Sequence, residues 1–195
     1  MRLRLATAAD AEQVAAIYRP AVVERATSFE FEPPSGAEMA ERITRTLRRT
    51  PWLVAEAPDG PSGLLLGYAY ASIHMERAAY QWSVDVSAYV SASARRKGVG
   101  RALYQALFAV LRLQGFRNAY AGITLPNPAS EGLHRALGFE PVGVYRRVGY
   151  KHGRWHDVAW FALTLGAHDT EPPAPRALPE VLDEVEVLLA QASAT

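Results

Sequence analysis

The pattern of apolar and polar positions predicts seven strands and four helices over most of the chain. Strands are predicted where apolar residues alternate with polar ones or form short runs, at residues 2–6, 52–57, 64–73, 80–90, 118–125, 139–148 and 155–165. Helices are predicted where apolar residues recur every three or four positions, in the segments after Thr7, at 38–49, from Val99 to Gly115 and from Asn127 to Gly138.

The order of these elements is β-α-α-β-β-β-α-β-α-β-β. The middle strands follow one another after short connections, which favours antiparallel pairing. The strand–helix–strand unit around the helix that begins at Val99 favours a parallel pair. We therefore predict the α+β class, with a mixed sheet and helices on its faces.

The composition changes after Leu165. Four prolines lie between Pro172 and Pro179, which is typical of a linker. A final amphipathic helix is predicted from about Glu180 to Ala192, and it packs either on the domain or on a partner. We expect one domain over residues 1–166, followed by a Pro-rich linker and a helix over residues 167–195.

A basic, glycine-containing turn stands between the predicted strand that ends at Val90 and the helix that begins at Val99. Its spacing, R-x-x-G-x-G, lets the backbone approach a phosphate where no Cβ intervenes. The first turn of the helix offers unpaired N–H groups and the positive end of the helix dipole. Four cations surround the turn: Arg95, Arg96, Lys97 and Arg101. We interpret the turn as a cradle for a pyrophosphate.

Other glycine motifs fit this turn less well. A dinucleotide-binding fingerprint requires a third small residue where this chain has Leu103, and a P-loop requires Gly-Lys-Ser/Thr, which is absent. A glycine helix cap beside a solvated basic turn remains as the alternative, and the four cations weigh against it.

Composition and charge narrow the function. The chain has 195 residues, 49% hydrophobic and 21% charged, which suits a globular core. A net charge of +1 gives no overall attraction to nucleic acid or to a membrane surface. No cysteine is present, the N-terminus lacks the apolar core of a signal peptide, and no apolar run approaches the ~20 residues of a membrane span. We expect a cytoplasmic protein without a metal, nucleic-acid or membrane partner.

Five further motifs occur in a consistent order along the chain. They are TPWLVAE (50–56), RAAYQWSVDVSAYVS (77–91), LPN (125–127), LHRALGF (133–139) and GYKHGRWHDV (149–158). With the basic turn, they resemble the GNAT superfamily of acyl-CoA-dependent N-acetyltransferases, and within it the branch of phosphinothricin and amino-acid sulfoximine acetyltransferases. The resemblance covers about Leu3 to Leu165.

The resemblance implies a GNAT fold, with a mixed and mostly antiparallel sheet in which two central parallel strands splay apart around acetyl-CoA. The pantetheine arm is expected along the fourth strand and the pyrophosphate on the basic turn. Asn127 is expected to bond the donor as well as to cap a helix. The implied donor contacts are Ala88, Tyr89, Val90, Arg95, Arg96, Lys97, Gly98, Val99, Gly100, Arg101, Asn127 and Ser130.

The same resemblance suggests three catalytic residues. An α-amino group has a pKa of ~8, so a base must take a proton before the amine can attack a thioester. The family's glutamate base falls on Asp85, which is shorter, and an interpretation as an ion-paired carboxylate remains open. His134 is a second candidate base near the amine, and backbone N–H groups of the fourth strand are expected to bind the oxyanion. Tyr104 is expected to protonate the departing thiolate, or to be a core residue.

The acceptor is expected to be an amino-acid-like small molecule. Implied contacts come from the loop after the first helix and from the segment before the fourth strand, namely Phe29, Met75, Arg77, Tyr80 and Asp85. Arg77 suits a carboxylate or phosphinate, whereas the family's preceding lysine is replaced by Met75. A homodimer is also expected. The alternatives are a different amine, such as a peptide N-terminus, or a non-catalytic acetyl-CoA-binding module.

Overall fold

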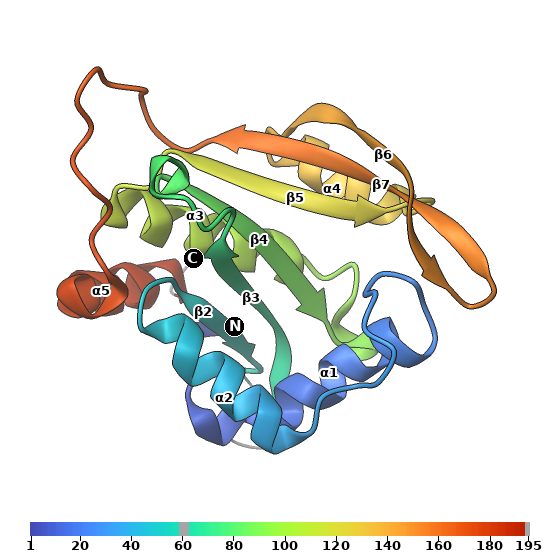
Figure 1. Cartoon of the computed structure of the whole chain (residues 1–195). Helices are drawn as coiled ribbons and strands as arrows, with labels where there is room; N and C mark the ends of the chain where they lie inside the picture. Colours follow the sequence, from blue (N-terminus) through green and yellow to red (C-terminus); the bar gives the residue numbers. More distant parts are fainter. Residues whose placement is uncertain (59–62, 194–195) are drawn as a thin grey trace.

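The computed structural model describes residues 1–58 and 63–193, and within them it contains one mixed sheet covered by helices (Figure 1). The strands are β1 (Arg2–Leu5), β2 (Trp52–Glu56), β3 (Leu65–Ile73), β4 (Ser83–Val90), β5 (Asn118–Thr124), β6 (Glu140–Lys151) and β7 (Arg154–Thr164). The α-helices are α1 (Ala11–Val23), α2 (Gly36–Leu47), α3 (Val99–Gln114), α4 (Pro128–Ala136) and α5 (Leu182–Ser193).

The strands lie in the order β1-β2-β3-β4-β5-β7-β6. The β4–β5 pair is parallel and the other five neighbouring pairs are antiparallel. The predicted α+β class and the order of the elements are therefore confirmed, as is the parallel pairing across α3.

Several element boundaries differ from the prediction. The strand predicted from residue 80 begins at Ser83, because residues Ala78–Tyr80 form a 3-10 turn. The connection between the last two strands is shorter than predicted, because β6 runs to Lys151 and β7 starts at Arg154. His152 and Gly153 join them with φ values of 50° and 75°. Two successive left-handed residues form the turn that matches the twist of a hairpin.

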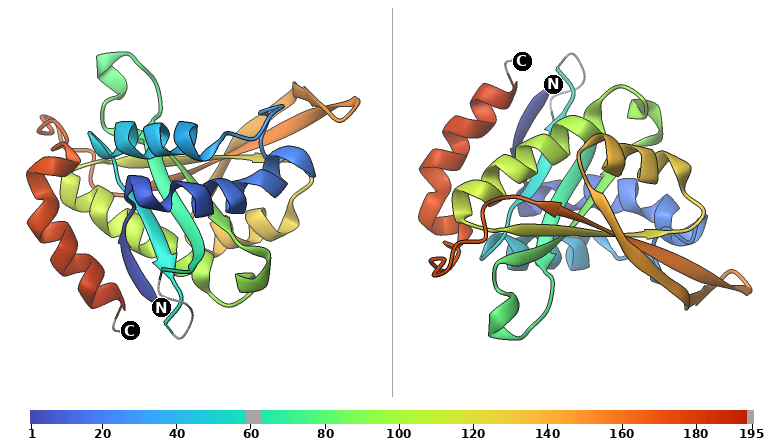
Figure 2. Two further views of the ribbon diagram at one scale, coloured as in Figure 1. Left: turned by 90° about the horizontal axis from the view of Figure 1, so that it is seen from below. Right: turned by 90° about the horizontal axis from the view of Figure 1, so that it is seen from above.

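Two apolar layers enclose the sheet (Figures 1 and 2). On one face α3 buries a stripe that includes Leu103, Leu107 and Leu111, which are spaced four residues apart along one side of the helix. On the other face α1 and α2 bury Val14 and Ile43 against the sheet. Because side chains alternate along each strand, successive residues of β4 enter different layers.

The C-terminal helix packs on the domain, which was one of its two expected positions. Figure 2 shows α5 beside β1 and α3, and its Val185 and Leu189 are buried in the core under α3. The segment that precedes α5 is also hydrogen-bonded to the domain. The Gln114 side chain donates to the carbonyl of Arg176 at 2.9 Å, and the Trp82 indole donates to the carbonyl of Pro173 at 2.8 Å.

Candidate active site

The two parallel strands part at the centre of the sheet. The β4–β5 ladder contains three residue pairs and ends where Asp85 lies opposite Tyr120. Beyond this pair a cleft of about 730 Å³ opens between the strands, bordered by α1 and by the first turns of α3 and α4. Its size is that of a small-molecule site. The predicted splayed strands are thus present in the structure.

The basic turn lies at one end of this cleft. Gly98 is the N-cap of α3 and has a φ of 81°, a left-handed conformation that glycine adopts without a steric penalty. The cationic side chains of Arg95, Arg96 and Arg101 are exposed around the free N–H groups of the first helical turn. Polar backbone hydrogens, the helix dipole and three cations together fit a diphosphate.

Most of the predicted donor contacts line the cleft. The residues that do so are Ala88, Tyr89, Val90, Arg95, Arg96, Gly98, Val99, Gly100, Arg101, Asn127 and Ser130. Lys97 is exposed and is not among the lining residues. Asn127 has the predicted capping role, because its side-chain oxygen accepts a hydrogen bond from the Ser130 N–H at 3.2 Å.

Tyr104 and His134 form a hydrogen-bonded pair in the wall of the cleft. His134 Nδ1 lies 2.8 Å from the carbonyl of Ser130, an acceptor, so Nδ1 carries a hydrogen and Nε2 does not. The Tyr104 hydroxyl therefore donates to His134 Nε2, at 3.1 Å. Burial lowers the pKa of His134 and raises the pKa of Tyr104 well above its usual value. Both side chains are neutral near pH 7.

Asp85 lies on the other face of the sheet. Its neighbours Val84 and Val86 pack in the core under α3, so the Asp85 side chain points toward the face that carries α1 and α2. Burial raises the pKa of Asp85, and a hydrogen bond from His74 opposes this shift. The structure thus separates the two candidate bases, since His134 contacts Tyr104 and the core aromatic Phe139 instead.

His74 is the partner of Asp85 that the sequence analysis missed. Its Nδ1 lies 2.7 Å from Asp85 Oδ1. The antiparallel β3–β4 register pairs Ser72 with Asp85, which brings the residue just after β3 next to this carboxylate. The sequence indicates two neighbouring strands joined by a short connection. Only their register, which the sequence does not give, shows that His74 lies next to Asp85.

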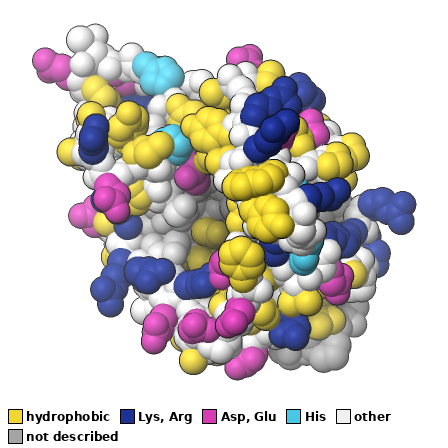
Figure 3. Space-filling model, turned by 45° about the vertical axis from the view of Figure 1, so that its right-hand side comes forward, with side chains coloured by type: hydrophobic (Ala, Val, Ile, Leu, Met, Phe, Trp, Pro, Cys, Tyr) yellow, Lys and Arg dark blue, Asp and Glu magenta, His cyan; other side chains and the backbone are white. Residues whose placement is uncertain are grey.

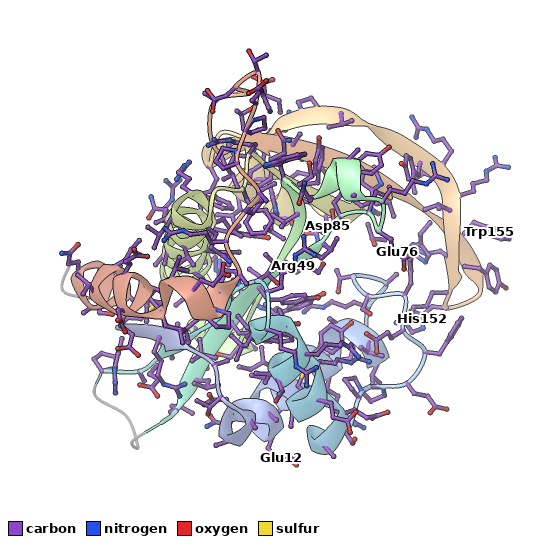
Figure 4. All side chains as sticks on the ribbon, turned by 60° about the vertical axis from the view of Figure 1, so that its left-hand side comes forward. Glu12, Arg49, Glu76, Asp85, His152 and Trp155 are labelled. Atoms are coloured by element: carbon purple, nitrogen blue, oxygen red, sulfur yellow. The ribbon has the colours of Figure 1, made fainter. Side chains whose placement is uncertain are left out.

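The predicted acceptor contacts come from two separate segments. Met75, Arg77 and Tyr80 are exposed in the connection between β3 and β4. Phe29, in the α1–α2 loop, packs on the β6–β7 hairpin, where its ring fills the space that a Cβ on Gly149 would occupy. In Figure 4, His152 and Trp155 mark the tip of this hairpin and Asp85 lies deeper, on β4.

A buried lysine holds the α1–α2 loop on the hairpin. Lys151, at the end of β6, is 3% exposed. Its Nζ donates three hydrogen bonds, at 2.6 to 2.7 Å, to the carbonyls of Val22, Ser28 and Glu30. The loop is also tied from within, because Ser28 Oγ lies 2.7 Å from the Tyr18 hydroxyl. The hairpin therefore sets the position of Phe29.

No group of three or more histidine, aspartate or glutamate side chains is placed to bind a metal ion in residues 1–58 and 63–193. In the same described ranges no helix is long and apolar enough to cross a bilayer.

Parallel strands that part around a cleft, with a basic, glycine-capped helix N-terminus at one end, fit a transferase that uses an acyl-CoA. The model of the acetyltransferase (GNAT) domain matches residues 3–160. A phosphinothricin N-acetyltransferase of Streptomyces viridochromogenes is 39% identical over 90% of this chain and 91% of its own length. A methionine sulfoximine/methionine sulfone acetyltransferase of Pseudomonas aeruginosa is 37% identical over 87% of this chain and 98% of its own.

A solved structure indicates the same family. The crystal structure of a phosphinothricin acetyltransferase from Sinorhizobium meliloti, in complex with acetyl-CoA, superimposes with a TM-score of 0.82 at 42% identity, over 88% of this chain and 92% of that one. This chain belongs to the GNAT acetyltransferase family, in the branch of the phosphinothricin and methionine sulfoximine enzymes. It is an N-acetyltransferase, and acetyl-CoA is its donor.

Proposed function

We propose that this enzyme transfers the acetyl group of acetyl-CoA to the α-amine of an amino acid that resembles phosphinothricin or methionine sulfoximine. The observation that carries the proposal is the position of Asp85 at the point where β4 and β5 part, next to the donor cleft. The named relatives support the acceptor class, because enzymes of both activities match nearly their whole length.

In the proposed mechanism the chain supplies three functions around a direct attack of the amine on the thioester. A base at Asp85 removes a proton from the amine, directly or through a neighbouring group. Backbone N–H groups of β4 donate to the oxygen that becomes negative as the C–N bond forms. As the C–S bond breaks, the Tyr104 hydroxyl releases the 3.1 Å hydrogen bond that it donates to His134 Nε2, gives its proton to the departing sulfur and regains one from the nitrogen of the forming amide.

Arg77 is proposed to bind the acidic end of the acceptor. Its guanidinium is exposed in the connection that leads to β4, and its planar fork matches a carboxylate or a phosphinate. A polyamine would be repelled there. The nearby Met75 is uncharged. An acidic acceptor therefore meets one cation fewer here than it would in a site with lysine at this position.

The acceptor proposal is tested by the release of CoA thiol from acetyl-CoA. Phosphinothricin, methionine sulfoximine, alanine and a short peptide are each offered as the acceptor, with a reaction lacking acceptor as the blank. Turnover is expected with the first two compounds and near the blank with the others. Turnover confined to the peptide or to alanine contradicts the proposed acceptor class and leaves the family assignment intact.

We also propose that the enzyme forms a homodimer through the β6–β7 hairpin. Exposed apolar side chains gather on this hairpin, and Figure 3, which brings this end of the molecule forward, shows a broad apolar patch. The side chains concerned are Val142, Val144, Tyr145, Val148, Tyr150 and Trp155. An apolar area of this kind is typical of an interface between subunits.

Sedimentation equilibrium measures the proposed dimer. Trp155→Arg is expected to shift the protein toward the monomer mass, because it places a charge among apolar contacts. Val187→Arg, on the solvent side of α5, is the matched control, since the two residues are 60% and 59% exposed. A monomeric wild-type protein, or a dimer that survives Trp155→Arg, contradicts this interface.

A further inference from the structure

We propose that His74 is the base that takes the proton from the acceptor amine, and that Asp85 is the carboxylate that orients it. This inference rests on the proposed function, because it names the group that performs the deprotonation. It changes the role of Asp85 from the base itself to the partner of the base.

The hydrogen bond between the two side chains defines the state of the imidazole. A carboxylate only accepts hydrogen bonds, so the 2.7 Å contact with Asp85 Oδ1 places the hydrogen of His74 on Nδ1. The other ring nitrogen, Nε2, then carries the free electron pair that can accept a proton. An aspartate on Nδ1 that selects the tautomer and stabilises the imidazolium is the arrangement of histidine bases in hydrolases.

Aromatic side chains hold the His74 ring in place. The ring stacks on Tyr120 at a centroid distance of 4.4 Å and an angle of 18°. Trp160 and Tyr80 flank it edge-on, at 6.1 Å and 6.4 Å. The ionisable groups that face the imidazole are therefore Asp85 from β4, Tyr120 from β5 and Tyr80 from the 3-10 turn before β4. Among these groups, Asp85 is the one that forms a hydrogen bond with the imidazole.

The position of His74 suits a base for the acceptor. It directly follows Ile73, which pairs with Val84 of β4, and its side chain reaches Asp85, the last residue of the β4–β5 ladder before the strands part. Its side chain is 16% exposed and that of Asp85 is 32% exposed, so the pair is shielded and still reachable. By contrast, the Asp85 carboxylate is shorter than a glutamate and already has one oxygen engaged by His74.

The step balances without any other reactant. An N–H bond of the amine breaks and its proton moves to His74 Nε2, leaving the electron pair on nitrogen. That pair forms the C–N bond with the acetyl carbon, and the carbonyl oxygen becomes negative. As the C=O bond re-forms, the C–S bond breaks, and the extra proton still on nitrogen passes to the departing sulfur, which leaves as the CoA thiol. The imidazolium stays paired with the Asp85 carboxylate until it returns its proton to water.

Chemical rescue tests this proposal with the full-length enzyme and the acceptor found to be active. His74→Ala opens a space beside Asp85, whereas His74→Phe keeps an aromatic ring there and carries no base. Both variants are expected to lose about 100-fold or more in kcat while they retain acetyl-CoA affinity. Added imidazole is expected to restore about a tenth of the activity to His74→Ala and none to His74→Phe. A purely structural role gives no such difference.

Other outcomes overturn the proposal. If His74→Phe keeps a third or more of the wild-type kcat, or if imidazole restores neither variant, Asp85 acts without His74. If the wild-type enzyme acetylates none of the acceptors, the proposed function fails. The His74–Asp85 pair is then tested without turnover. Nitrogen NMR of the free enzyme near pH 7 then reports the tautomer. The pair is supported if His74 carries its proton on Nδ1 in the wild type and this tautomer is less populated in Asp85→Asn. A proton on Nε2 in the wild type overturns the proposal.

Discussion

Gly100→Asp is expected to weaken acetyl-CoA binding by about 100-fold or more without unfolding the protein. Gly100 lies in the first turn of α3 and lines the cleft. A Cβ at this position would be 3.5 Å from Leu133 and 3.6 Å from Val90, which are ordinary contact distances. A carboxylate there competes with the diphosphate for the same N–H groups and repels it, although it suits the helix dipole.

The matched control is Gly100→Asn, which has nearly the same shape and no charge. Calorimetric titration with acetyl-CoA is expected to show a much smaller loss for the asparagine variant. The two variants should unfold at similar temperatures, since neither introduces a steric clash. Equal losses for both would mean that bulk rather than charge decides, and an unchanged affinity for Gly100→Asp would place the diphosphate elsewhere.

Lys151→Met is expected to lower the free energy of unfolding by about 3 kcal/mol or more. The methionine keeps the length of the side chain and removes the three hydrogen bonds to the carbonyls of Val22, Ser28 and Glu30. Buried acceptors without donors carry the full cost of desolvation. Burial lowers the pKa of Lys151, and the nearby charge of Glu30 opposes that shift.

Urea denaturation measures this loss, with Arg154→Met as the control. Arg154 is also a cation of the hairpin but is exposed, so its replacement should change stability by less than about 0.5 kcal/mol. At temperatures where Lys151→Met remains folded, KM for the acceptor should rise more than KM for acetyl-CoA, because Phe29 loses its support. A stability change equal to that of the control would show that the lysine does not hold the loop.

Much of the cleft wall formed by the starts of α3 and α4 could be predicted from the sequence, because its signals are local. Gly98 and the cations around it lie between Val90 and Leu103, so a strand, a turn and a helix could be recognised from neighbouring residues. The helix cap at Asn127 is local for the same reason, since its partner Ser130 is three residues away. Backbone conformation and helix capping depend on such short separations.

The acceptor side depends on contacts between distant parts of the chain. Lys151 reaches carbonyls more than 120 residues away, and no periodicity or motif indicates which loop it holds. His134 and Asp85 were both candidate bases in the sequence. The alternation of side chains along β4 turns Asp85 toward the face that carries α1 and α2, whereas His134, on α4, packs against Tyr104 and Phe139. The packing of α5 on the core was likewise one of two open alternatives.

Periodicity, glycine placement and motif order were thus enough to predict the elements, their order and the glycine-capped basic turn before α3, because each depends on neighbouring residues. The pairing of His74 with Asp85 and the anchoring of the loop by Lys151 became visible with the folded chain. Both depend on strand register and on the meeting of the hairpin with the α1–α2 loop. These are set by the packing of the whole sheet, in which one residue of slippage would turn each side chain to the other face.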